Sequence, residues 1–126
     1  MNVNPLIMEL KIITGLPVVP DLYVTAPGEK RSDKWITFTY QDERPVHFGD
    51  NVPLDDTAYM SVNLFTPKSF NYLELKEQIK EYLESIGIVT NCESYVYLEN
   101  QIPVRQTVFE VTITQEREGK TWLTLD

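Results

Sequence analysis

Cysteine and histidine are nearly missing from this chain, which has one of each, Cys92 and His47. A single cysteine forms no internal disulfide, and such usage is typical of a reducing compartment. No apolar run approaches the roughly 18 residues of a membrane-spanning helix, and the first residues lack the charged start of a signal peptide. Paired cysteines, glycine-rich phosphate loops and zinc-type His/Glu spacings are also absent. The sequence therefore predicts a soluble cytoplasmic protein without a cofactor.

The few residues that could do chemistry stand alone. His47 has no serine or cysteine near it in the sequence, and Cys92 would act as a nucleophile only beside a base in the fold. Carboxylates gather in one segment, which is the best candidate for a cation site, and they are Asp42, Glu43, Asp50, Asp55 and Asp56. Their spacing does not match the twelve-residue calcium loop. We predict no catalytic residue and no metal site.

Positive charge is scarce. The 126 residues include 11 Lys and Arg against 19 Asp and Glu, which gives a formal charge of −8. The basic cluster of Lys30, Arg31 and Lys34 is interrupted by Asp33. Binding of a nucleic-acid backbone needs clustered cations, so the composition argues against a nucleic-acid-binding surface. The length and an apolar content of 42% suit a single domain, 1–126, with its own core.

The alternation of apolar and polar residues predicts most of the secondary structure. Period-two patterns predict strands at Trp35–Gln41 and Ala58–Phe65, and apolar residues spaced by four, four and three positions predict a helix over Asn71–Ile86. Two further strands are expected at Glu93–Leu98 and Val104–Thr114. This order favours an α+β fold of two layers, in which a mostly antiparallel sheet carries one main amphipathic helix on one face.

The N-terminal part is expected to add smaller elements to this unit. Residues 1–16 have an apolar stripe and stop signals that predict a short helix. The proline within Val18–Val24 makes this segment an edge strand or a strand entry, and Thr25–Lys34 has the composition of a mobile loop.

Two other segments connect or end the predicted elements. Asp42–Thr57 is long for a plain hairpin, so we expect an excursion that holds a short strand at Val46–Phe48. Gly87 is expected to end the main helix in the left-handed conformation. The C-terminal tail, 116–126, is charged and then apolar, which fits either an added strand or a partner-docking segment.

Aromatic residues recur on the strand faces opposite the predicted core. They are Trp35, Tyr59, Phe65, Tyr95 and Tyr97. Exposed aromatic area often marks a protein interface. The alternative is that the N-terminal helix or the loops cover this second face.

Short runs of residues, in a fixed order along the chain, carry a resemblance to a known family. They are Trp35–Tyr40, Phe48–Pro53, Tyr59–Phe65, the helix end Ser85–Gly87, Tyr97–Glu99 and the last strand, Thr107–Thr114. Over roughly residues 17–115 the chain is similar to the tail-terminator and tail-completion proteins of long-tailed bacteriophages and prophages. The resemblance rests on patterns of apolar and aromatic residues rather than on an invariant motif.

The resemblance implies an α+β protein that is not an enzyme and that assembles into a ring, commonly a hexamer. Such a ring caps the finished tail tube and joins the tail to the head connector. The implied partners are other copies of the chain, the tail-tube protein and a head-completion protein, while DNA passes through the channel without specific recognition. The implied location is the virion neck, after assembly in the cytoplasm of a bacterial host.

Two groups of residues are predicted to make these contacts. The aromatic group, expected at the subunit interface, is Trp35, Tyr59 and Phe65. The charged group, expected to contact the tail tube or the connector, is Lys30, Arg31, Asp50, Asp55 and Asp56. Three alternative functions are another neck or minor tail protein, a small enzyme or ligand-binding domain, and a monomeric adaptor.

Overall fold

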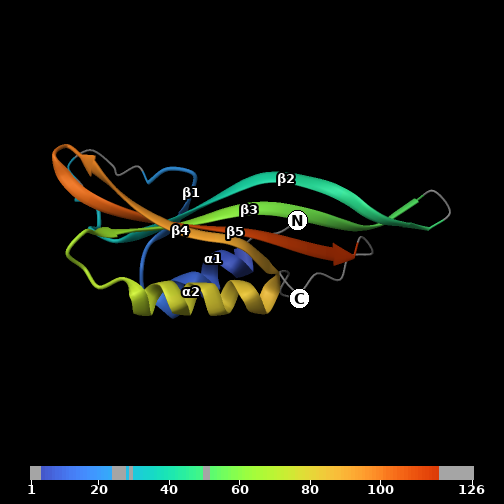
Figure 1. Ribbon diagram of the computed structural model, residues 1–126. Helices are drawn as coiled ribbons and strands as arrows, with labels where there is room; N and C mark the ends of the chain where they lie inside the picture. The colour runs from blue at the N-terminus through green and yellow to red at the C-terminus, as the bar shows by residue number, and fades with distance from the viewer. Residues whose placement is uncertain (1–3, 24–27, 29, 50–51, 117–126) are drawn as a thin grey trace.

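The fold consists of one sheet and two helices. The computed structural model describes residues 4–23, 28, 30–49 and 52–116, with the backbone alone for 42–49, 52–56, 115 and 116. Its elements are α1 (Asn4–Thr14), β1 (Val18–Pro20), β2 (Trp35–Gly49), β3 (Val52–Pro67), α2 (Leu73–Ile86), β4 (Ile88–Glu99) and β5 (Ile102–Glu116). The strands form a five-stranded sheet of order β1-β2-β3-β5-β4, with α1 and α2 below it in Figure 1. The predicted α+β fold is confirmed.

Four of the five strands pair antiparallel. β3 lies between β2 and β5, and β4 pairs with the other side of β5. β1 is the exception, because it pairs with β2 in the parallel sense over three positions, from Val18 opposite Ile36 to Pro20 opposite Phe38. The predicted edge strand after the N-terminal helix is therefore present, and it ends at the proline, which cannot donate a hydrogen bond.

The first hairpin is longer than the sequence predicted. β2 and β3 stay paired from Trp35 opposite Phe65 to Gly49 opposite Val52, so the predicted excursion over Asp42–Thr57 is wrong. The expected short strand at Val46–Phe48 is part of β2. The backbone pairing continues where the apolar alternation stops, and Figure 1 shows this arm of the hairpin reaching well beyond α2.

The core lies between the sheet and the two helices. The strands contribute Ile36, Phe38, Met60, Val62, Leu64, Phe109, Val111 and Ile113, all buried, and the helices contribute Leu6, Leu10, Ile79 and Leu83. α1 packs beside α2 on this face, so the N-terminal helix does not cover the second face of the sheet. α1 has one buried apolar stripe, formed by Leu6 and Leu10. This stripe extends the core that the strands and α2 form.

Different glycines end the two helices for different reasons. Gly15 follows α1 with φ +68°, the left-handed conformation that favours glycine. Gly87 follows α2 with φ −169° and ψ −159°, so the prediction of a left-handed end is wrong. A Cβ at Gly87 would lie 2.5 Å from the carbonyl oxygen of Thr112 and 2.9 Å from Cγ1 of Ile113. Glycine is therefore required here because β5 passes close to the end of α2.

Candidate interaction surface

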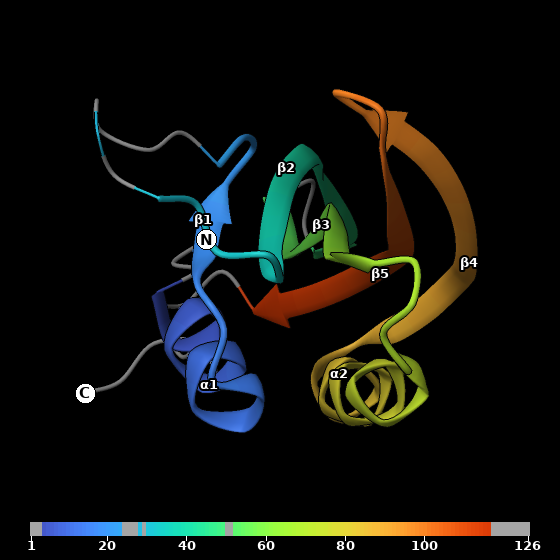
Figure 2. The same ribbon diagram turned by 90° about the vertical axis from the view of Figure 1, so that its left-hand side faces the viewer.

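The second face of the sheet, called the open face below, carries neither helix. Figure 2 shows the β4–β5 hairpin curving from α2 up and around the side of the sheet. At the far end of this curve, Nη1 of Arg31 lies 2.7 Å from Oε1 of Glu99, the last residue of β4. This ion pair joins the segment before β2 to the opposite margin of the sheet. The hydrogen bond to Glu99 raises the pKa of Arg31, which therefore stays charged.

An aromatic cluster lies beneath this ion pair. The Trp35 ring stacks on Phe65, with centroids 4.9 Å apart and planes 10° from parallel, and Tyr23 meets it edge-on at 5.8 Å. The Arg31 guanidinium carbon lies 4.2 Å from the Trp35 ring centroid. These contacts leave Trp35 only 5% exposed. The segment before β2 thus covers Trp35 at this end of the open face, whereas Tyr95 on the same face stays 48% exposed.

The structure brings part of the predicted aromatic group together. Trp35 and Phe65 are directly opposite in the β2–β3 ladder, whereas Tyr59 lies six residues along β3, about 20 Å from Phe65. Phe65 and Tyr59 are partly exposed, and Trp35 is nearly covered within its own chain. The assignment of these residues to a subunit interface stays a prediction, with Phe65 and Tyr59 offering more surface to a neighbour than Trp35.

The middle of the open face is polar and largely satisfied within the chain. Thr37, Ser61 and Asn63 are buried there. Gln106 donates a hydrogen bond from Nε2 to Oδ1 of Asn63 over 3.1 Å. Hydrogen-bonding groups in these positions make the middle a poor site for apolar docking.

The predicted charged group is split between two ends of the molecule. Lys30 is exposed and lies next to the Arg31–Glu99 pair. Asp50 lies outside the described residues, and for Asp55 and Asp56 the structure describes the backbone, which pairs with β2 and with the end of β5. Asp55 is ten residues along β3 from Phe65, about 33 Å from the cluster. The backbone of Asp55 and Asp56 therefore lies far along β3 from Lys30 and Arg31.

Exposed apolar side chains concentrate on the β4–β5 hairpin. Tyr95, Val96, Leu98 and Ile102 are 48%, 42%, 70% and 63% exposed. The alternation places Val96 and Leu98 on the core side of the strand, but α2 lies against the other end of β4, where Cys92 joins the core. Nothing in the period-two pattern indicates how far a helix extends over a strand, so sequence reasoning identified Tyr95 and missed Val96, Leu98 and Ile102.

β4 is also a margin of the sheet. Among the described residues, this twelve-residue strand pairs with β5 alone, and its outer side has no neighbour in the sheet. A strand with an unpaired side can accept another strand through its backbone groups. The hairpin thus combines an open set of backbone donors and acceptors with exposed apolar side chains.

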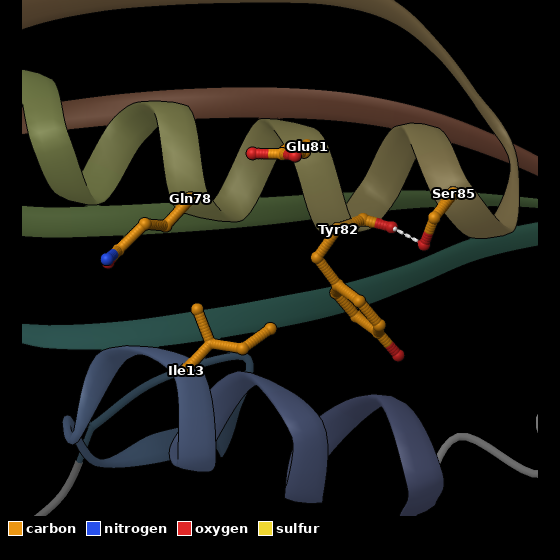
Figure 3. A pocket seen from close by; sticks show the side chains of 5 residues that line it. All are labelled: Ile13, Gln78, Glu81, Tyr82 and Ser85. Carbon is orange, nitrogen blue, oxygen red and sulfur yellow. Dashed lines mark hydrogen bonds between the residues drawn. The ribbon is translucent and has the colours of Figure 1, made fainter.

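A groove between the helices is the second surface feature. It is lined by Ile13 of α1 and by Gln78, Glu81, Tyr82 and Ser85 of α2, with a volume of about 310 Å³. Figure 3 shows the Ile13 side chain and the Tyr82 ring extending into the space between the two helices. Burial, with a smaller contribution from Glu9, raises the pKa of Tyr82. The groove lining thus combines the apolar Ile13 side chain and the Tyr82 ring with the polar side chains of α2.

The chemistry available at these surfaces is limited. In the described part of the chain, no three His, Cys, Asp or Glu side chains come together as a possible metal site. Burial raises the pKa of Cys92 and keeps the thiol protonated, while the side chain of His47 lies outside the described residues. No described helix has the length and apolar character to cross a membrane. Neither the protein-family models nor the curated proteins include a match to this chain.

Proposed function

We propose that the protein is a tail terminator of a bacteriophage or prophage, which forms a ring at the end of the tail tube and provides the surface that joins the head. The support from the structure is the β4–β5 hairpin, where a free sheet margin coincides with four exposed apolar side chains. The resemblance of residues 17–115 to tail-terminator proteins supplies the biological assignment.

The two margins of the sheet differ from each other, which suits a ring. One margin is β4. The other margin is the part of β2 that continues past the three positions at which β2 pairs with β1. A contact between unlike margins of successive copies is heterologous, and repeating it closes a ring when the rotation permits. Through the intervening antiparallel pairs, β4 runs antiparallel to β2. A neighbour rotated about an axis along the strands would therefore present its β2 antiparallel to β4.

The mechanism of such a ring is steric. A ring seated on the last layer of the tube occupies the sites that the next tube subunit would use, so growth stops there. The opposite side of the ring then meets the head-completion protein. The long β2–β3 arm is suited to one of these contacts because it extends beyond the helices. The acidic composition of the chain, with a formal charge of −8, repels DNA from the channel wall.

Electron microscopy of tails assembled without this protein tests the function directly. We expect tubes of abnormal length that fail to attach to heads. Tubes of normal length with normal head attachment would contradict the proposal.

Substitution on the hairpin tests the surface assigned to the ring. Leu98→Lys places a charge on a side chain that is 70% exposed, so we expect the unfolding midpoint to change little and assembly on the tail tube to fail. Ile12→Lys is the matched control, because Ile12 is 73% exposed on α1. Assembly is measured by sedimentation of the purified protein with tail tubes. Equal binding of the two variants would contradict the assignment.

A further inference from the structure

We infer that the groove between α1 and α2 is the docking site of the chain's own C-terminal segment, Trp122–Leu125. The inference does not rest on the proposed function. It starts from an apolar recess, lined by Ile13 and the Tyr82 ring, that the rest of the described chain leaves open.

The occupant is indicated first by composition. After β5 the chain continues with charged residues up to Lys120, and then has Trp122, Leu123 and Leu125 within four positions. Burial of such side chains is favourable by roughly 1.5–3 kcal/mol each. The groove offers the Ile13 side chain and the Tyr82 ring as apolar contacts for such side chains.

The end of β5 places this segment within reach. Ile113 lies against the C-terminal end of α2, because a Cβ at Gly87 would be 2.9 Å from its Cγ1. β5 continues three residues past Ile113 to Glu116, and Trp122 follows Glu116 by six residues, which span up to about 20 Å when extended. Ser85, at the near end of the groove, is two residues before Gly87. A segment of this length reaches the groove without strain.

The other apolar surface lies at the opposite end of β5. Leu98 lies opposite Pro103, which is thirteen residues before Glu116, so about 40 Å of strand separates the hairpin end from the end of β5. Trp122 follows Glu116 by six residues, which span at most about 20 Å. Measured along β5, the helix groove is therefore the apolar surface nearer to the start of the tail.

Disulfide trapping in the full chain tests the inference. The background is Cys92→Ser, which removes the single native thiol. Ser85→Cys with Leu123→Cys places one thiol in the groove and one on the tail. The matched control is Glu84→Cys with Leu123→Cys, since residue 84 is exposed, adjacent in sequence and absent from the groove lining. An undocked tail has a similar effective concentration at both positions, so docking appears as a difference between the two rates.

We expect the Ser85→Cys pair to form an intramolecular disulfide roughly tenfold faster than the control, read as a fast-migrating monomer on a non-reducing gel. Adding Trp122→Ser should reduce that rate to the control value. Equal rates for positions 84 and 85 would overturn the inference. A cross-linked dimer in place of the monomer would also overturn it, because the tail would then dock on another copy.

Discussion

Replacing Trp35 with alanine separates a structural role from a docking role. Trp35 lies on the face opposite the core and yet is 5% exposed, between Phe65, Tyr23 and the Arg31 guanidinium. A tryptophan buries up to about 250 Å², which at about 25 cal/mol/Å² gives an upper value of about 6 kcal/mol. Large-to-small substitutions of this kind typically cost about 3–5 kcal/mol. We therefore expect Trp35→Ala to lower the free energy of unfolding by about 4 kcal/mol.

Tyr95→Ala is the matched comparison. Through Phe65 and Gln106, Tyr95 is in the same cross-strand row as Trp35, but it is 48% exposed, and we expect a loss of about 1 kcal/mol. Urea unfolding followed by circular dichroism measures both. With a urea dependence of about 2 kcal/mol/M, the Trp35→Ala midpoint should fall by about 2 M. Losses of similar size for the two variants would refute the argument that the segment before β2 buries Trp35.

Two further predictions concern the end of α2 and the single thiol. Gly87→Ala should cost about 1–3 kcal/mol in unfolding experiments because Thr112 blocks the added carbon, and Gly87→Asn should cost more. At Gly15 the order should reverse, since no atom lies within 4 Å and asparagine tolerates its positive φ better than alanine. Any other order would contradict the steric account. Burial raises the pKa of Cys92, so its reaction with a disulfide reagent should accelerate at a more alkaline pH in the folded protein than in urea; coincident pH profiles would contradict the burial.

The sequence was a good guide wherever a side chain's environment depends on its own element. The period-two alternation in Trp35–Gln41 and Ala58–Phe65 marks residues that face the core, and these strands are present in β2 and β3. The helix predicted over Asn71–Ile86 is α2, with Ile79 and Leu83 buried as its stripe requires. These features follow from the fixed repeats of helix and strand.

Candidate-site residues were harder to place because their environment comes from distant parts of the chain. The alternation predicts that Trp35 is exposed. In the structure, the Arg31 guanidinium lies over the Trp35 ring and pairs with Glu99, which is 68 positions away in the chain. Leu98 reads as a core residue by the same alternation, but it is exposed because α2 ends its contact with β4 before that point. Periodicity indicates the side of a strand and does not indicate what lies against that side.

The sequence by itself determined the α+β class and the side of each strand and helix that carries the apolar residues. Both depend on local periodicity, which does not change with the packing of the rest of the chain. Only the tertiary structure decided that α1 packs beside α2, that the hairpin continues through Asp42–Thr57 and that Trp35 is covered. The physical reason is that backbone pairing and the curvature of a sheet join residues far apart in the chain, and no local pattern records which segments will meet.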